Sequence, residues 1–280
     1  MQKFLGTGTM KKIKKGSREM SELASIVLLI VIGIMAGITN AAAGLASLVS
    51  YPSLLAMGLS PVMANVTSCF STVASGYSSV VTSARELRNN RKQVWIMIPV
   101  VLAGAFIGAL LLFILPSKWF QELVPICIGM TGIVLIVPHK PRQASPVLVQ
   151  NSRAFGRSRL SRIMAWGGIF IVGIYAGYFN AGAGVMMLTL LTVVNRQQSF
   201  AVNNALKNVA MTATNTMAII IFAIETVIYW HHVLPLFIGN IIGGILGPII
   251  VRRLPGRLMQ VVVGSGALIL SVSLVIRNMM

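Results

Sequence analysis

Charged side chains are scarce in this sequence, and acidic ones are the scarcest. The 280 residues include only five Asp and Glu, and charged residues make up 10% of the chain. A soluble domain carries about 25% charged residues, so this chain has too few to cover a water-facing surface. No Asp, Glu, Lys, Arg or His occurs in the 62 residues from Leu23 to Ala84. Core helices of soluble proteins do not come in such runs, so we expect hydrocarbon as the surrounding solvent.

Acidic residues are also missing from the interior of the apolar segments, where Glu122 and Glu225 stand only at the edges. A carboxylate-based cation or metal site therefore has almost no ligands to draw on. The two cysteines, Cys69 and Cys127, are isolated within apolar segments, which excludes a disulfide framework and indicates buried packing. No nucleophile–base arrangement and no phosphate-cradling glycine loop occurs. We expect neither an enzyme nor a bound cofactor or metal.

Basic residues dominate the charge that is present, with a net charge of +18. They gather in the connections between apolar segments, chiefly in residues 11–18, 85–92 and 140–162. This is the pattern of the positive-inside rule, and it favours contact with anionic lipid headgroups over binding of nucleic acid. We expect these connections and both termini on the cytoplasmic side. On that layout Arg252, Arg253 and Arg257 fall on the opposite side, which the rule does not favour.

The apolar segments predict about eight transmembrane helices, each near the 20 residues that cross a bilayer. They are residues 23–38, 61–83, 93–115, 119–137, 163–178, 199–224, 230–251 and 258–276. Two further apolar pieces, 45–57 and 185–194, are too short to cross comfortably. We expect each of these to form a half-helix, a re-entrant segment or a strained crossing.

The sequence repeats itself internally. The segment from Gly33 to Gly44 matches the segment from Gly173 to Gly184 at most positions, with an offset of 140. After a slip of one residue, the match resumes at an offset of 139, as in the following pairs: Asn65 with Asn204, Gly104 with Gly243, Gly108 with Gly247, Leu115-Pro116 with Leu254-Pro255, and Gln121 with Gln260. Four such blocks in register predict two homologous halves.

Each half contains an Asn-Ala-x-Ala-Gly segment, beginning at Asn40 and at Asn180, where an apolar helix should be finishing its crossing. Gly and Ala lower the steric cost of bending, and a broken helix exposes backbone groups that lipid cannot satisfy. In secondary transporters, paired broken helices in two repeats mark the substrate site. The alternative is close helix packing by small residues, which is how we interpret Gly104, Gly108, Gly243 and Gly247.

Polar residues recur at helical spacing along the second span of each half. They are Asn65, Ser68, Thr72, Ser75 and Ser79 in the first half, and Asn204, Lys207, Asn208, Met211, Thr212 and Asn215 in the second. Such stripes face protein or water rather than lipid. They predict either a substrate path or hydrogen bonding between helices.

Lys207 is the one charged residue well inside a span, about 12 Å along the helix from Ser199. An ammonium at that depth is costly, and its helical neighbours Asn204 and Asn208 are neutral. It is either a counter-charge for an anionic substrate or a lysine that snorkels to the interface. The matching residue in the first half is Ser68, so any role of the lysine is one-sided.

The doubled segments, Gly37 to Pro52 with Gly58 to Ser68 and Gly177 to Gly184 with Ser199 to Asn204, resemble the TauE/SafE sulfite exporter family, also called TSUP permeases. The resemblance runs from about Leu23 to Ile276. It implies transport of sulfite, sulfonates or other organic anions across a bacterial inner membrane. The family usually has a Gly-Gly-Gly run where this chain has Ala-Ala-Ala-Gly and Ala-Gly-Ala-Gly, a departure that bears on the substrate.

The sequence therefore predicts an all-α polytopic membrane protein built from two four-helix repeats. Residues 1–21 form a basic cytoplasmic segment, 22–137 the first membrane repeat, 138–161 a basic cytoplasmic linker and 162–280 the second repeat. We expect a secondary transporter for small anions, with a permease for another solute or a non-transporting membrane partner or sensor as the alternatives. The expected substrate-binding residues are Asn40, Gly44, Asn65, Ser68, Asn180, Gly184, Asn204, Lys207 and Asn208.

Overall fold

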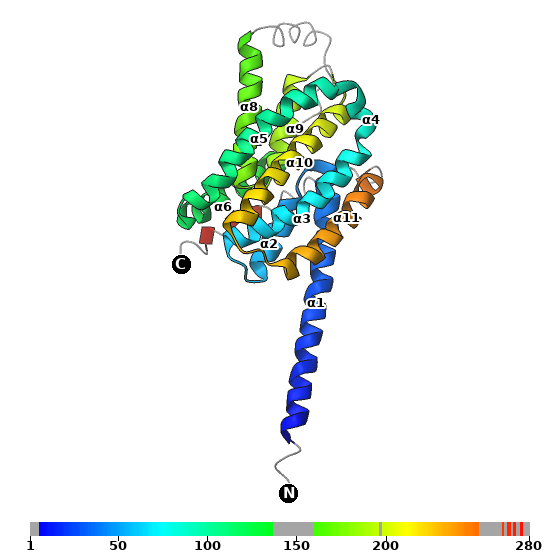
Figure 1. Cartoon of the computed structure of the whole chain (residues 1–280), viewed down its shortest axis with the longest axis vertical. Helices are drawn as coiled ribbons and strands as arrows, with labels where there is room; N and C mark the ends of the chain where they lie inside the picture. Colours follow the sequence, from blue (N-terminus) through cyan, green and yellow to red (C-terminus); the bar gives the residue numbers. More distant parts are fainter. Residues whose placement is uncertain are drawn as a thin grey trace.

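The computed structural model describes residues 6–136, 159–195 and 198–251, together with positions 265, 268–269, 271–272 and 275–276. In this part of the chain all regular structure is helical and no strand occurs (Figure 1). Most of the expected final span, 258–276, and most of the expected linker, 138–161, lie outside the described residues, as do Leu254, Pro255 and Gln260.

The helices follow the apolar segments of the sequence closely. They are α1 (Gly6–Ala43), α2 (Ala46–Ala56), α3 (Pro61–Thr82), α4 (Ala84–Leu87), the 3₁₀ turn η1 (Arg88–Asn90), α5 (Arg91–Ile114), α6 (Ser117–Ile136), α8 (Arg159–Tyr178), α9 (Ala183–Val194), α10 (Phe200–Glu225) and α11 (Trp230–Val251). The first helix begins earlier than expected, at Gly6. Its N-terminal part projects beyond the bundle (Figure 1).

Within the described residues, three helical stretches are long and apolar enough to cross a membrane: Leu23–Ala41, Ala84–Ile114 and Phe200–Glu225. Shorter apolar helices cover Ala46–Ala56, Ile163–Tyr178, Ala183–Val194 and Trp230–Leu246. Large apolar side chains point outward from the bundle, among them Trp95 and Ile224, which are 74% and 78% exposed. Such an apolar exterior is what a hydrocarbon solvent favours and what water opposes.

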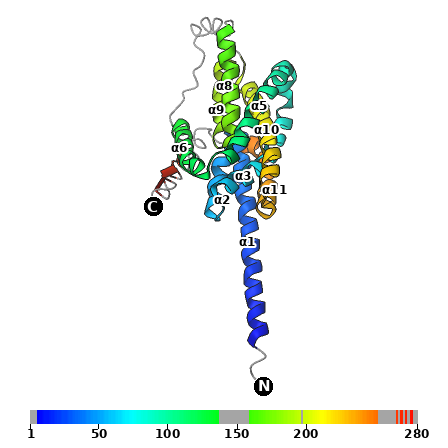
Figure 2. The same ribbon diagram turned by 60° about the vertical axis from the view of Figure 1, so that its left-hand side comes forward.

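The two halves run in opposite directions. Helix α1 enters the bundle from one end, whereas α8, its counterpart in the second half, enters from the other end (Figures 1 and 2). The helices α3 and α10 are also antiparallel, because Ser83 at the end of α3 meets Asn208 near the start of α10, while Met63 meets Thr226. The repeat in the sequence is therefore accompanied by an inverted arrangement in space.

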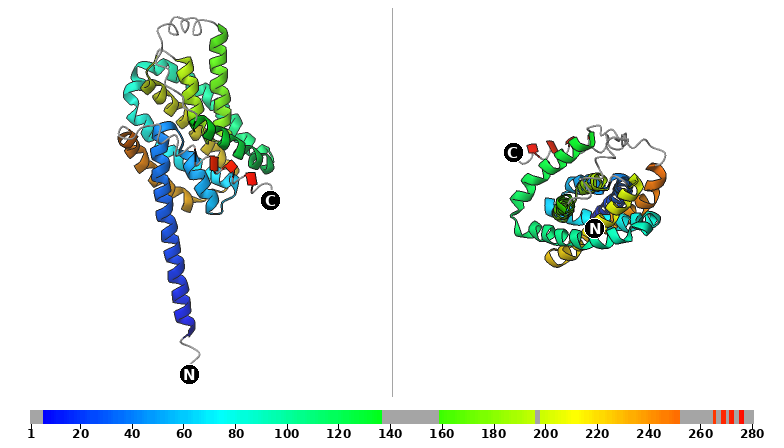
Figure 3. Two further views of the ribbon diagram at one scale, coloured as in Figure 1. Left: turned by 180° about the vertical axis from the view of Figure 1, so that it is seen from behind. Right: turned by 90° about the horizontal axis from the view of Figure 1, so that it is seen from above.

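Each half breaks its first helix near the middle of the bundle. Helix α1 ends at Ala43, and α2 leads back toward the end of the bundle where α3 starts; α9 follows the break after α8 in the same way (Figure 3). Helices of 11 and 12 residues are about 16–18 Å long, too short for a 30 Å hydrocarbon layer. Both short pieces are therefore half-length helices that turn back within the bundle (Figure 3).

Equivalent serines start the second long helix of each half. Ser60 precedes α3 and its side chain accepts a hydrogen bond from the amide of Met63 at 3.4 Å. Ser199 precedes α10 and accepts one from the amide of Val202 at 3.3 Å. Both serines have the extended backbone typical of an N-cap. These caps fix where each long helix begins. Ser60 and Ser199 are separated by 139 positions, the offset of the internal repeat.

Two helix pairs hold the halves together, α1 with α11 and α5 with α8, and each pair combines one helix from the first half with one from the second. A Cβ added to Gly104 would lie 2.5 Å from the carbonyl oxygen of Phe170, and one added to Gly37 would lie 2.6 Å from that of Asn240. Gly108 and Gly243 likewise face backbone of the partner helix. Close packing by Gly104, Gly108 and Gly243 is therefore confirmed. The surroundings of Gly247 are not among those that the structure describes.

The glycine contacts also give the direction of these pairs. Gly104 faces Gly173 and Gly108 faces Tyr178, so α5 and α8 run in the same direction and start at the same end of the bundle. Gln198, just before α10, donates to Asn90 at 3.2 Å and places the start of α10 there too. We call this end the α4 end. Helix α1 starts at the opposite end.

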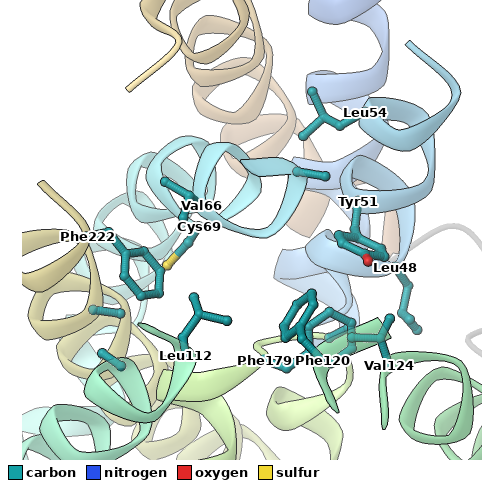
Figure 4. Packing of buried hydrophobic residues seen from close by; sticks show 14 of the residues in the cluster. Leu48, Tyr51, Leu54, Val66, Cys69, Leu112, Phe120, Val124, Phe179 and Phe222 are labelled. Atoms are coloured by element: carbon teal, nitrogen blue, oxygen red, sulfur yellow. The ribbon is translucent and has the colours of Figure 1, made fainter. Parts of the chain in front are cut away.

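Aromatic side chains fill the core beside the second break. The ring of Tyr51 on α2 meets the ring of Phe179 edge to face, with centroids 5.3 Å apart, and Phe120 on α6 meets Phe179 at 5.5 Å (Figure 4). All three side chains are at most 1% exposed. Edge-to-face pairs of this kind stabilise a fixed arrangement of their backbones. Cys69 is buried in the same cluster, as expected.

Candidate functional site

A small cavity lies in the middle of the bundle, where the two helix breaks meet α3 and α10. It is lined by Asn40, Gly44, Ala46, Ser47, Thr72, Gly76, Asn180, Lys207, Asn208, Met211, Thr212 and Asn215. The centres of water-sized molecules can occupy about 10 Å³ of it, which is roughly the room of one water molecule. In this conformation the cavity has very little free space.

The first break brings a helix start to the cavity. Gly44 has φ of +73°, a conformation that residues with a Cβ adopt rarely, and it turns the chain from α1 into α2. Ala46 and Ser47, the first residues of α2, line the cavity as a result. The start of a helix carries partial positive charge, so this end of α2 favours a negative group nearby.

The second break differs in detail from the first. Helix α8 ends at Tyr178, two residues before Asn180, whereas α1 continues three residues beyond Asn40. The turn itself is made by Gly182, with φ of +78°, rather than by Gly184. Gly184 instead packs on the first break, since a Cβ there would lie 2.7 Å from the carbonyl oxygen of Gly44. The two breaks therefore touch backbone to backbone.

Lys207 reaches into the cavity from α10. Its side chain is 1% exposed, and its Nζ has no hydrogen-bond partner in the part of the chain that the structure describes. The Nζ is 3.4 Å from where a Cβ on Gly44 would stand. A lysine that snorkels would extend its ammonium toward an interface. This side chain ends instead at the meeting point of the two breaks.

Four asparagines bring amide groups to the cavity wall: Asn40, Asn180, Asn208 and Asn215. Asn40 donates from Nδ2 to Oγ of Ser75 at 2.7 Å, and Asn208 donates to Oγ of Ser83 at 3.5 Å. The Oδ1 atom of Asn180 is buried and has no partner among the described residues. An unpaired buried oxygen is costly, so this atom is available to a donor on a ligand or to water.

Of the nine residues expected from the sequence, the cavity brings together Asn40, Gly44, Asn180, Lys207 and Asn208, with Gly184 directly behind Gly44. The other three do not line it. Asn65 donates to the carbonyl oxygen of Tyr178 at 3.1 Å and so satisfies a backbone group at the end of α8. Ser68 shares a hydrogen bond with Ser50. Asn204 is half-buried on α10, and its Oδ1 has no partner in the described region.

The polar stripes of α3 and α10 divide into two kinds of residue. Most hydroxyls bond back to their own helix, as Thr72 does to the carbonyl oxygen of Ser68 at 2.7 Å and Thr212 to that of Asn208 at 2.7 Å. Contacts between the two helices are fewer, for example the 3.1 Å hydrogen bond of Tyr77 with Thr216. The stripes thus build a polar wall whose hydroxyl hydrogens are largely used within each helix.

Ser47 and Gly76 line the cavity although the sequence analysis did not single them out. Gly76 lies one turn after Thr72, and a Cβ there would be 2.8 Å from Oγ1 of Thr212. Its place in the polar stripe of α3 was a signal that could have revealed it. Ser47 had no such signal, because its role depends on how α2 returns into the bundle.

No group of three or more His, Cys, Asp or Glu side chains comes together within the described parts of the chain. Acidic side chains are equally missing from the cavity wall that these parts form. The chemistry offered by the wall is one amine, several amides and hydroxyls, and the apolar Met211. Such a wall can bind a small negatively charged or hydrogen-bonding solute by non-covalent contacts.

Comparisons with known proteins find membrane transporters. A probable membrane transporter protein from Haemophilus influenzae is 25% identical over 226 residues, covering 79% of this chain and 83% of that protein. The probable membrane transporter protein YfcA from Escherichia coli K12 is 22% identical over 221 residues, covering 79% and 78%. No solved structure matches. The family model described as "Sulfite exporter TauE/SafE" matches residues 29–274, so this multi-pass membrane protein belongs to the TauE/SafE sulfite exporter family.

Proposed function

We propose that this protein is a secondary transporter for small anions, with sulfite, sulfonates and related sulfur-containing or organic anions as substrates. The observation that carries the proposal is Lys207, a buried lysine whose Nζ has no partner in the described structure and lines the central cavity. The description of the matching family model names sulfite export, which supports the choice of anion.

A charged lysine inside the membrane carries a free-energy cost. An ammonium within a membrane helix costs about 3 kcal/mol on insertion scales. A lysine at this depth is therefore expected to have a function. An anion in the cavity would offset that cost by direct attraction to Nζ. Amide donors such as Asn208 and the partial positive charge at the start of α2 favour the same sign of ligand.

The alternatives use the same features less well. A permease for a neutral solute would use the amides of Asn40 and Asn180 but would leave the amine uncompensated. A membrane partner or sensor without transport would need the repeats only for assembly. The small cavity at the meeting point of two inverted repeats favours transport, because that is where secondary transporters bind substrate.

For the layout in the membrane, we propose eight long membrane helices: α1, α3, α5, α6, α8, α10, α11 and the segment 258–276. Because α1 and α3 start at the same end of the bundle, as α8 and α10 do, α2 and α9 are re-entrant helices that bring the chain back to the end from which α1 and α8 entered. Arg85, Arg88, Arg91 and Lys92 are exposed and cluster at the α4 end, where α8 starts as well. The positive-inside rule assigns this end to the cytoplasm of a bacterial inner membrane. The start of α1 then faces the other side, because it lies at the opposite end of the bundle. This proposal departs from the expected cytoplasmic N-terminus and places the basic residues 11–18 on the side that the rule does not favour.

This layout also accounts for the basic residues that the sequence analysis could not accommodate. Helix α11 runs parallel to α3, since Trp230 meets Phe70 and Gly244 lies against Ser75 and Ser78. It therefore ends at the α4 end, and its last described residue, Val251, directly precedes Arg252 and Arg253 in the sequence. Because α8 and α9 together return to the α4 end, the second half agrees with the charge rule in this layout.

Transport would proceed by exposing the cavity to each side in turn. The cavity is narrow in this conformation, and the touching glycines of the two breaks form a contact that must loosen for the cavity to widen. Rocking of one inverted repeat against the other is the usual route to such alternating access. The energy would come from an ion gradient or from the gradient of the anion itself. We propose the anion and membrane lipids, not nucleic acid, as the partners.

The test is counterflow of labelled sulfite in proteoliposomes. Protein-dependent exchange of label against unlabelled sulfite is the expected result, and it should be lost in Lys207→Met. Absence of exchange for sulfite and for every small sulfonate tried, with correctly inserted protein, would favour the non-transporting alternative.

A further inference from the structure

We propose that the cavity accepts anions with a single negative charge and rejects anions with two. This inference rests on the proposed anion site, and it narrows the substrate to one charge class. It follows from counting the charges and the free hydrogen-bond donors that the wall presents.

The wall offers one positive charge. Among the described residues that line the cavity, Lys207 alone is charged. The helices packed on α10 carry their described charges at the α4 end: Arg85 and Glu86 on α4, and Arg91 and Lys92 at the start of α5. A bound anion with one charge makes a neutral pair with Lys207, whereas an anion with two leaves one charge without a partner.

The neutral groups of the wall cannot take the place of a second cation. Each amide of the wall has two N–H donors, and the Nδ2 of Asn40 uses one of them for Ser75, while the hydroxyls of Thr72 and Thr212 donate to carbonyl oxygens of their own helices. The buried Oδ1 of Asn180 adds partial negative charge, since no described group donates to it. The N–H groups that remain are neutral dipoles, so they attract a second negative charge less strongly than a second cation would.

Dehydration sharpens this difference. The cavity has room for about one water molecule, so an anion bound there must leave its hydration shell behind. The cost of removing an ion from water rises with the square of its charge, whereas its attraction to a single ammonium rises only in proportion to the charge. Doubling the charge therefore quadruples the cost and only doubles the compensation.

The inference can be tested with anions whose charge does not depend on pH. Wild-type protein in proteoliposomes would be assayed for counterflow of labelled methanesulfonate, with unlabelled nitrate or methanesulfonate and unlabelled sulfate or methanedisulfonate as competitors at matched ionic strength. We expect the two doubly charged anions to compete at least tenfold more weakly than the singly charged ones. Competition by sulfate or methanedisulfonate as strong as that by methanesulfonate would overturn the charge selectivity while leaving anion transport intact.

A second variant tests the cause of the selectivity. Met211 lies one helical turn after Lys207 and lines the same cavity, so Met211→Lys adds a second ammonium to the wall. We expect this variant to shift the preference toward sulfate and methanedisulfonate. An unchanged preference in a folded Met211→Lys protein would contradict the inference. If neither charge class exchanges in the wild type, the proposed function fails together with this inference.

Discussion

A Cβ placed on Gly184 would lie 2.7 Å from the carbonyl oxygen of Gly44, although the two glycines are 140 residues apart in the chain. They occupy the same place in the two repeats, and each lies at the break of its own half. The contact joins the repeats at the cavity. A Cβ placed on Gly44 would lie 3.4 Å from the Nζ of Lys207.

The first prediction concerns this contact. Gly184→Ala should push the two breaks apart, because its methyl group would collide with backbone, which cannot rotate away as a side chain can. We expect sulfite counterflow to fall at least tenfold and thermal stability to drop. Gly167→Ala on α8 is the matched control, since a Cβ there meets nothing within 4 Å. Equal transport by Gly184→Ala and Gly167→Ala would show that the contact is not needed for closure.

The second prediction concerns the paired asparagines. Replacing Asn40 or Asn180 by Leu removes an amide from the cavity wall and supplies no donor in its place, so transport should be abolished while the amount of protein in the membrane stays near normal. Counterflow normalised to membrane protein measures this. Normal transport by both variants would assign these asparagines to packing.

Asn65→Leu provides the contrast for that series. Its amide bonds the carbonyl oxygen of Tyr178 and does not line the cavity, so its loss leaves a buried backbone oxygen unpaired. We expect a stability loss of about 1–3 kcal/mol in thermal unfolding, without a change in the concentration of anion that half-saturates transport. A large change in that concentration at unaltered stability would instead move Asn65 into the binding site.

Much of this arrangement could be read from the sequence, and the reasons are physical. The apolar runs predicted the long helices, because a backbone in hydrocarbon must satisfy its own hydrogen bonds. The internal repeat located the two breaks near Asn40 and Asn180. Lys207 stood out because a cation inside a span is rare. These signals are local, so they survive without knowledge of the packing.

What the sequence left open depends on three-dimensional packing. Asn65 and Asn204 have the same spacing as the cavity residues, yet each lies in the first turns of its helix and does not line the cavity. The inverted orientation of the halves was not visible either, because similar residues at a constant offset fit parallel and inverted repeats equally well. Whether 45–57 and 185–194 cross or return likewise follows from where α3 and α10 begin.

The third prediction tests the proposed layout in the membrane. In a protein with Cys69→Ala and Cys127→Ser, single cysteines would be placed at the exposed positions Asn89 and Val227, which lie at opposite ends of the bundle. A membrane-impermeant maleimide applied to whole cells should label Val227→Cys but not Asn89→Cys, and should label both after permeabilisation. Labelling of both from outside, or the reverse order, would contradict the assignment of the α4 end to the cytoplasm.

The most direct test of the whole account is the rate of sulfite counterflow in Lys207→Met, compared with Lys118→Met at equal protein in the membrane. Lys118 is exposed at the start of α6 and serves as the matched loss of one positive charge. If Lys207 binds the anion, the first variant should lose at least 90% of wild-type counterflow, roughly the tenfold effect of 1.4 kcal/mol, while Lys118→Met transports normally. Lys207→Arg should retain part of the activity, because it keeps the charge. Counterflow by Lys207→Met at the wild-type rate would contradict the central claim.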